Sequence, residues 1–244
     1  MLAWSLEAAF DAAWPALKTA PAGDWLCKSA PGVSRRSNSA NPMGAHARLA
    51  GRTVEAIEAV YAKWGQPAYV RLPSLLDEAP DRLLEGRGYT AEGLSLTLIG
   101  PLAPPPPGQA ELSPLPSPEW LAALNRINGR DGDRSRVFDE ALARIDAPAA
   151  YAGVRREGQL VAGAYAVVFD GWLCLEAVAT DPAWRGRGLA GEAAAALMGW
   201  GAAEGARAVG LQVQADNAAA IGLYRRLGID RELYRYHYRK APQS

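Results

Sequence analysis

The chain has 244 residues, of which 26 are basic and 26 are acidic, so its formal net charge is zero. Apolar residues make up 49% and charged residues 21%, a balance that excludes an intrinsically disordered chain and a protein that binds nucleic acid through an overall basic charge. At roughly 100–200 residues per domain, the length fits one large domain or two small ones.

The scarcity of cysteine and histidine excludes further classes. Cys27 and Cys174 are the only cysteines and match no metal or redox spacing, so we expect a reduced, cytoplasmic protein. His46 and His237 are the only histidines, so we expect neither a metal site nor a triad hydrolase. We also expect no transmembrane helix, because no run of about 18 uninterrupted apolar residues occurs. The N-terminal segment has no basic region and carries an early acid, unlike a secretory signal.

In the first half of the chain, apolar spacing predicts alternating helices and strands. Val54, Ile57, Tyr61 and Trp64 share one helical face. A strand at 68–72, a second helix at 75–86 and a final strand after Gly88 follow.

A proline-rich segment follows this half. Eight prolines lie between Pro101 and Pro118, too many for a helix or a central strand. We therefore predict a degenerate domain at 1–100, a linker at 101–118 and a second domain at 119–244.

The second half again alternates between helix and strand signals. Asp170-Gly171 predicts a hairpin turn, and Asn217 and Gly228 are typical residues for the start and the end of a helix. The predicted elements in chain order are helices at 120–126 and 137–145, strands at 159–169 and 172–180, a glycine-rich loop at 181–188, a helix at 189–204, a strand at 208–214, a helix from 217 to 228, and a strand at 233–239 that closes the sheet.

The two halves align with each other at an offset of 140 residues. Asn41-Pro42 falls on Asp181-Pro182, and Leu49-Ala50-Gly51 falls on Leu189-Ala190-Gly191. The helix, strand and turn signals coincide over the whole overlap, and residues 24–28 and 35–41 overlie the hairpin of the second half. We therefore interpret the chain as two copies of one fold.

The loop Arg185-Gly186-Arg187-Gly188 has the chemistry of an anion site. Its glycines let the backbone approach a ligand, and the helix that follows directs its positive dipole end to the same place. The two arginines can add charge to phosphate oxygens. Alone, this pattern also fits a plain tight turn.

Two segments together resemble the GNAT acyltransferase superfamily. The first is Val178-Ala179-Thr180-Asp181-Pro182-Ala183-Trp184-Arg185-Gly186-Arg187-Gly188-Leu189-Ala190, similar to the family's Arg/Gln-x-x-Gly-x-Gly/Ala loop. The second runs from Asn217 through Leu223-Tyr224 to Leu227-Gly228-Ile229. The resemblance covers about 119–240 and implies an α+β fold class: tandem GNAT-like folds, each a mixed, mostly antiparallel twisted sheet flanked by helices.

The resemblance also implies roles for individual residues. Acetyl-coenzyme A would be the co-substrate. The backbone of Val178 and Thr180 would bind its pantetheine arm, and Asn217 would contact the arm while also serving as a helix cap. Arg185 would open the loop that cradles the pyrophosphate. The remaining loop residues expected to bind are Gly186, Arg187, Gly188, Leu189 and Ala190.

Tyr224 would protonate the departing thiolate, with core packing as the alternative. Glu176 is the candidate base for the amine, directly or through a water, because a carboxylate on a strand beside the cofactor is costly to bury without a role. The alternative for Glu176 is an ion pair with an arginine on a neighbouring strand.

The first copy departs from the pattern. Ala45-His46-Ala47-Arg48 replaces the loop and Leu84 replaces Tyr224, so we expect no productive cofactor binding there. The polar run 35–41 predicts a solvated edge strand, or else Arg36 and Asn38 line a pocket for an anionic or hydrogen-bonding part of the acceptor.

We therefore predict an N-acetyltransferase that moves an acetyl group from acetyl-coenzyme A to a small amine or an amino-acid-like acceptor, without metal, nucleic acid or membrane. The alternative is a non-catalytic acyl-coenzyme A-binding or regulatory protein. O-acyl transfer, a longer acyl group and the oligomeric state stay open.

Overall fold

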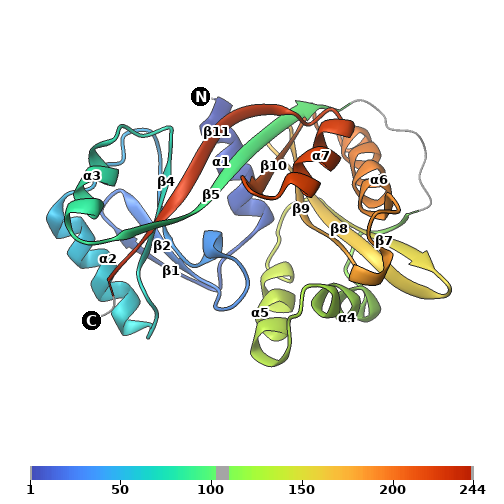
Figure 1. Cartoon of the computed structure of the whole chain (residues 1–244), viewed down its shortest axis with the longest axis horizontal. Coiled ribbons are helices and arrows are strands. Elements are labelled where there is room, and N and C mark those ends of the chain that lie inside the picture. Colours follow the sequence, from blue (N-terminus) through green and yellow to red (C-terminus); the bar gives the residue numbers. More distant parts are fainter. Residues whose placement is uncertain (1, 103–109, 243–244) are drawn as a thin grey trace.

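The computed structural model describes residues 2–102 and 110–242, which form one twisted sheet of eleven strands with flanking helices (Figure 1). The α-helices are α1 (Leu2–Ala13), α2 (Gly51–Lys63), α3 (Ala79–Gly86), α4 (Pro118–Ile127), α5 (Gly132–Leu142), α6 (Leu189–Ala203) and α7 (Ala218–Arg226). The strands are β1 (Lys18–Ala22), β2 (Trp25–Ser29), β3 (Ala40–Pro42), β4 (Tyr69–Pro73), β5 (Thr90–Pro101), β6 (Glu111–Ser113), β7 (Ala149–Arg156), β8 (Gln159–Phe169), β9 (Trp172–Thr180), β10 (Ala208–Gln214) and β11 (Arg231–Lys240). Two short 3-10 helices are η1 (Arg35–Ser37) and η2 (Pro182–Trp184).

The strands lie in the order β1-β2-β3-β4-β11-β5-β10-β9-β8-β7-β6. Among the strands of the described residues, the pairs β3–β4 and β9–β10 are parallel and the other pairs are antiparallel, so the sheet is mixed and mostly antiparallel. The last strand of each half pairs with the other half: β11 pairs with β4, and β5 pairs with β10. Figure 1 shows β5 and β11 side by side across the middle of the molecule.

The pairing itself repeats with the offset of 140 residues. Tyr238 is the register partner of Arg71, and the residues 140 positions away, Leu98 and Leu211, are also partners. The same holds between β5 and β11, where the pair Tyr236–Ser95 maps onto the pair Arg235–Leu96. The two halves are therefore related by an approximate two-fold axis that passes between β5 and β11.

This exchange of strands bears on the predicted boundaries. The sheet is continuous from the first half into the second, so each half receives a central strand from the other. The division into domains at 1–100 and 119–244 with a linker at 101–118 stays a prediction. The predicted linker is not purely a spacer, because residues 111–113 form β6 at the sheet edge and pair with β7. Residues 103–109 of that segment lie outside the described residues.

Two further expectations need correction. The strand predicted at 233–239 exists, but it lies between β4 and β5 rather than closing the sheet. The polar run 35–41 is not an edge strand: it contains η1, and only its last two residues enter β3. The reason is that Ser37, Ser39 and Asn41 are buried and bonded to nearby groups instead of facing water.

The core of the second half has two layers, one on each face of the sheet. Along β8, alternate residues belong to different clusters: Ala162, Ala164 and Ala166 pack with α6, whereas Tyr165 and Val167 pack with α1, α4 and α5. This alternation follows from the period of two in a strand. A third cluster in the first half is centred on α2 and β4.

Helix α1 belongs to the first half but lies on the strands of the second. The Tyr165 hydroxyl donates to the Ala13 carbonyl at 2.8 Å, and Trp172 Nε1 donates to Ser5 Oγ at 2.8 Å. This helix therefore fixes the first half against β8 and β9. Within the described residues, no helix has the length and apolar character needed to cross a bilayer.

Candidate active site

Strands β9 and β10 diverge and open a cleft in the sheet. They pair only from Trp172 to Cys174, beside 208–210 of β10. Beyond that point β9 has a bulge, because Glu176 pairs with Tyr165 on β8 while Ala179 pairs with Gly163. Such an insertion bends and twists a strand, and it leaves one edge of 175–180 without a strand partner.

A residue in a strained conformation marks this bulge. Ala177 has a φ of +51°, a region that residues with a side chain seldom adopt, and such strain is often found at functional sites. This positive φ lies just beyond the residues of β9 that pair with β10, so the bulge coincides with the opening of the cleft.

The glycine-rich loop lies between η2 and α6. Gly186 and Gly188 have φ values of +77° and +78°, and the space where a Cβ would stand is open at both. Gly188 is the N-cap of α6 and provides no side-chain cap to the first turn of the helix. Backbone N–H groups and the positive end of the helix therefore face open space, the arrangement that binds phosphate oxygens.

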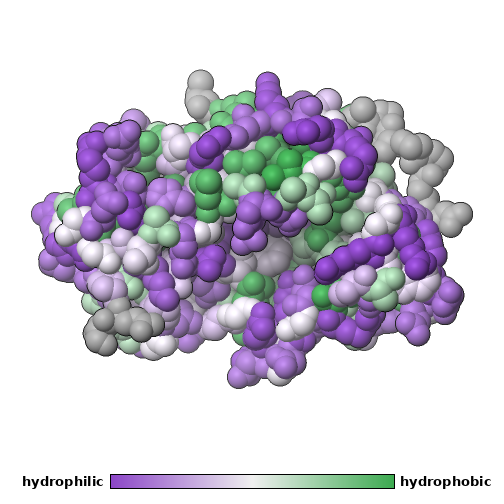
Figure 2. All heavy atoms as spheres, in the orientation of Figure 1, coloured by the Kyte–Doolittle hydropathy of each residue, from purple (hydrophilic) through white to green (hydrophobic). Residues whose placement is uncertain are grey.

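This loop forms one wall of a cavity of about 540 Å³. Figure 2 shows the surface hollowed beside α7, and Ile127 and Asn128 at the end of α4 also line the cavity. The cavity lining includes nine of the predicted residues: Val178, Thr180, Arg185, Gly186, Gly188, Leu189, Ala190, Asn217 and Tyr224. Arg187 is not part of that lining; its guanidinium lies 4.5 Å from the centre of the Trp184 ring.

The end of β9 contributes unpaired polar groups to the cavity. The Thr180 hydroxyl is buried without a hydrogen-bond partner, while the Thr180 carbonyl accepts from Arg185 Nε at 3.4 Å. Asp181 accepts from the amide of Ala183 at 3.0 Å and forms an ion pair with Arg126. These bonds fix the chain where β9 passes into the loop.

Asn217 and Tyr224 come from α7 on the opposite wall. Asn217 Oδ1 accepts from the amide of Ala220 at 3.1 Å, so the helix cap is present and the other side-chain atoms remain for a ligand. Burial raises the pKa of the Tyr224 hydroxyl far above its ordinary value, and the negative charge of Glu176 raises it further. The Tyr224 hydroxyl therefore holds its proton at neutral pH.

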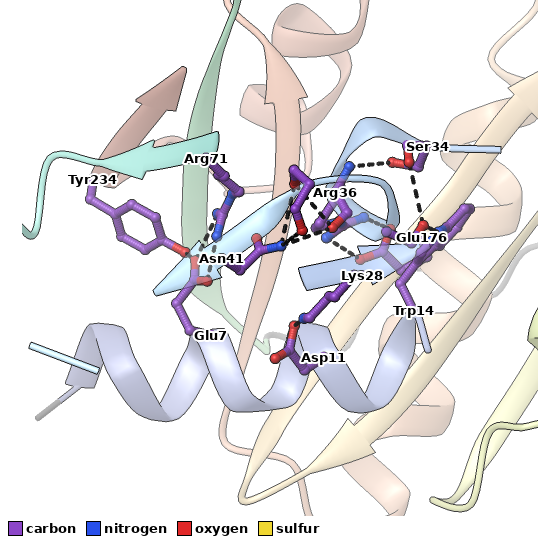
Figure 3. Close-up of polar contacts among 12 residues, drawn as sticks. Glu7, Asp11, Trp14, Lys28, Ser34, Arg36, Asn41, Arg71, Glu176 and Tyr234 are labelled. Atoms are coloured by element: carbon purple, nitrogen blue, oxygen red, sulfur yellow. Dashed lines mark hydrogen bonds and ion pairs between the residues drawn. The ribbon is translucent and has the colours of Figure 1, made fainter. Parts of the chain in front are cut away.

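Glu176 and Arg36 form a buried ion pair with two hydrogen bonds (Figure 3). Arg36 Nη1 donates to Oε1 at 3.0 Å and Nη2 donates to Oε2 at 2.8 Å. The side chains are 11% and 6% exposed. The arginine predicted as a partner for Glu176 thus comes from η1 of the first half, not from a neighbouring strand.

Aromatic rings enclose the guanidinium of Arg36. Its central carbon lies 5.4 Å from the ring of Phe10 on α1 and 5.6 Å from the ring of Trp14, which directly follows α1. Burial opposes the charge on Arg36, but the charge of Glu176 and its hydrogen bonds outweigh burial and raise the pKa of the guanidinium. The guanidinium therefore keeps its charge inside the protein.

Asn38, the other residue predicted to line an acceptor pocket, forms hydrogen bonds to the backbone of its own loop. Its amide nitrogen donates to the carbonyls of Ala30 and Ser34, and its oxygen accepts from the amide of Ala30 at 2.8 Å. It holds the segment in which Arg36 lies. Asn38 also lines a shallow cavity in the first half.

The first half has no counterpart of the loop. The amide of Arg48 donates to Asp24 Oδ2 at 3.0 Å, and its carbonyl accepts from Trp25 Nε1 at 3.0 Å. Leu84 stands where the second half has Tyr224 and is buried in the apolar cluster. That this half holds no coenzyme stays a prediction. Among the described residues, no group of three or more His, Cys, Asp or Glu side chains is placed to hold a metal ion.

Sequence patterns missed the residues that place the first half against the cleft. The spacing of Phe10 and Trp14 is typical of one apolar face of a helix. No pattern in the neighbouring sequence indicates that these rings enclose Arg36. The offset of the sequence repeat aligns Arg36 with Glu176, but an alignment of two halves does not by itself show that two side chains meet.

Comparisons with known proteins agree with this geometry. Residues 4–239 match the family described as "Probable histone acetyltransferase Rv0428c C-terminal". The uncharacterized N-acetyltransferase YobR of Bacillus subtilis is 23% identical over 241 residues, 96% of each chain. A GCN5-related N-acetyltransferase from Kribbella flavida has a TM-score of 0.72 at 18% identity, over 100% of this chain and 95% of that one. A tandem GNAT protein from the clavulanic acid biosynthesis pathway has a TM-score of 0.64 at 15% identity, over 84% and 76%.

Proposed function

Because this chain belongs to the family of the probable histone acetyltransferase Rv0428c C-terminal region, and so is a GNAT acyltransferase, we propose that it moves an acetyl group from acetyl-coenzyme A to a primary amine by direct attack in a ternary complex. The main support for the proposal is that the glycine loop, the end of β9 and Tyr224 all line the same cavity. The residues present fit the coenzyme, since a Cβ at Gly186 or Gly188 would occupy the open space over the loop.

Binding rests on three parts of the chain. The N–H groups at the start of α6 bind the pyrophosphate, with Arg185 beside them. The free edge of β9 at Val178 and Thr180 pairs with the pantetheine amides as an added strand would. Asn217 contacts the same arm from α7. Bound acetyl-coenzyme A supplies the thioester from which the acetyl group is transferred.

Proton transfer rests on Glu176 and Tyr224. As the amine nitrogen bonds to the acetyl carbon and the carbon–sulfur bond breaks, the amine proton goes to Glu176, directly or through a water. Tyr224 gives its proton to the sulfur. The two bonds from Arg36 occupy one lone pair on each oxygen of Glu176, so that each oxygen keeps a second lone pair for a proton. Arg36 therefore positions the carboxylate without blocking it.

The non-catalytic alternative is not favoured. A protein that only binds acyl-coenzyme A needs the loop, but it has no need of a protonated tyrosine on the cavity wall with a buried carboxylate close enough to raise its pKa. Coenzyme A binding without turnover on any amine is the result that would restore this alternative.

The test is thioester consumption with a panel of amines, together with mass spectrometry of the products. We expect an N-acetylated product and one equivalent of free coenzyme A thiol. Glu176→Gln should lower kcat about 10²–10⁴-fold, the usual contribution of a general base. Glu7→Gln is the matched control, because Glu7 forms the same kind of bidentate pair with Arg71 away from the cleft. Equal kcat values for the two variants would contradict the role of Glu176.

A further inference from the structure

A second cavity, of about 300 Å³, lies between the two halves. The segment 33–36 of the first half covers it on one side, and β5, β10 and β11 form the other. Its lining residues are Val33, Ser34, Arg35, Arg36, Gly93, Ser95, Gln212, Val213, Gln214, Tyr236 and Tyr238. Neither the glycine loop nor Tyr224 belongs to this lining, so the cavity is separate from the one that holds the coenzyme.

The lining of this cavity carries positive charge only. Arg35 and Arg36 line it, and no acidic residue does. Their partners lie outside the lining: Glu92 pairs with Arg35 Nε at 2.8 Å, and Glu176 pairs with Arg36. The Arg35 side chain is 44% exposed, so a ligand can approach it. These charges favour a ligand with a negative group.

Gln212 adds an unused hydrogen-bond donor. Its Oε1 accepts from the Tyr236 hydroxyl at 3.1 Å, which fixes the side-chain amide, and its Nε2 is buried without a partner. A buried donor left unpaired destabilises the protein. A ligand oxygen in the cavity would satisfy it, so the hydrogen-bonding requirement and the charge of the lining point to the same kind of group.

Glu176 lines neither of the two cavities, but it interacts with one residue of each. It is bonded to Arg36, which lines the second cavity, and its charge acts on Tyr224, which lines the first. An acceptor in the second cavity can therefore direct its amine toward Glu176 while its opposite end lies among Arg35 and Gln212.

We infer that the second cavity binds the acceptor through a carboxylate, so that the acceptor is a small molecule with both an amine and a carboxylate. Gln212 and Arg35 hold the carboxylate and are specificity-determining residues. This inference rests on the proposed acetyl transfer, because it concerns the acceptor of that same reaction.

The experiment compares amino acids with the amines that lack only the carboxylate. The pairs are L-tyrosine with tyramine, L-lysine with cadaverine and L-leucine with 3-methylbutylamine, and a lysine peptide with blocked termini completes the panel. We expect at least one amino acid to exceed its partner amine and the peptide by tenfold or more in kcat/KM. If every amine lacking a carboxylate matches its amino acid, or the peptide is the best acceptor, the inference is wrong while acetyl transfer stands. If nothing in the panel is acetylated, both fail.

Two variants test the assigned residue. Gln212→Leu removes the donor and Gln212→Glu keeps the size but adds a negative charge. Each should raise the KM for the best amino acid about tenfold or more, the second more than the first, with the KM for acetyl-coenzyme A unchanged. Gln66→Leu is the control, since Gln66 lines the other cavity of the first half, and it should change neither KM. Thermal melting confirms that each variant is folded. An unchanged amino-acid KM in folded Gln212→Glu would overturn the assignment.

Discussion

Arg36 on η1 of the first half and Glu176 on β9 of the second half form an ion pair with two hydrogen bonds, and they lie 140 residues apart, the offset of the sequence repeat. The first half therefore supplies the charged partner of a buried carboxylate at the cleft of the second half.

This pair should show strong coupling in a double-mutant cycle. Removing one partner leaves a buried charge without its counterpart, which costs about 3–5 kcal/mol, whereas replacing both with apolar residues is often close to neutral. We expect Arg36→Met and Glu176→Leu each to lower the free energy of unfolding more than the double variant does. Urea denaturation at pH 7 measures the three values. Costs that simply add would show that the two side chains do not depend on each other.

Gly188→Ala should weaken coenzyme binding. Alanine in the left-handed region costs roughly 1–2 kcal/mol, and its methyl group would enter the open space over the loop. We expect the Kd for coenzyme A, measured by calorimetry, to rise about tenfold or more. Gly199→Ala, in the middle of α6 with open space around it, is the matched control. It should leave the Kd unchanged and stabilise the protein by up to ~1 kcal/mol. Equal Kd values for both variants would exclude the loop as the binding element.

Acid should destabilise the protein through Glu7. Burial alone would raise the pKa of Glu7, but the charge of Arg71 with its hydrogen bonds, and the hydrogen bond from Tyr234, outweigh burial and lower it. A carboxylate with a lowered pKa in the folded state contributes stability above its unfolded pKa of about 4.3, and that stability is lost as the pH falls through the folded value. The unfolding free energy of Glu7→Gln should therefore fall less between pH 5 and pH 3 than that of the wild type. Parallel curves would contradict this.

The exchange of β5 and β11 predicts that neither half folds alone. A fragment of residues 110–244 lacks β5, so β10 and β11 would both expose unpaired edges. We expect this fragment to be unfolded or aggregated when expressed by itself, and to form a soluble complex when expressed together with residues 1–102. Size-exclusion chromatography and circular dichroism distinguish these states. A monomeric fragment with a cooperative melting transition would show that the predicted boundaries mark independent domains.

Local signals predicted much of the second half. The strands at 159–169, 172–180 and 208–214 have the predicted bounds, because alternation and the Asp170-Gly171 turn act within a few residues. The glycine loop was also visible, since only glycine adopts its backbone angles without strain. The family and the enzyme class followed from these segments.

Long-range pairing was not visible in the same way. The apolar pattern of 233–239 is the same whether the strand lies at an edge or in the centre, so its position between β4 and β5 could not be predicted. The segment 35–41 was misread because its serines and asparagine are polar by type but buried in fact, with their hydrogen bonds satisfied within the loop. The type of a residue shows that its side chain is polar, but it does not show which hydrogen-bond partners that side chain has in the fold.

The central claim is that Tyr224 protonates the departing thiolate in the cavity formed by the glycine loop, and Tyr224→Phe tests it most directly. The single-atom change keeps the ring and its packing. We expect kcat for coenzyme A release to fall about 10²–10⁴-fold, with the Kd for coenzyme A unchanged by calorimetry. Wild-type turnover in Tyr224→Phe would contradict the claim.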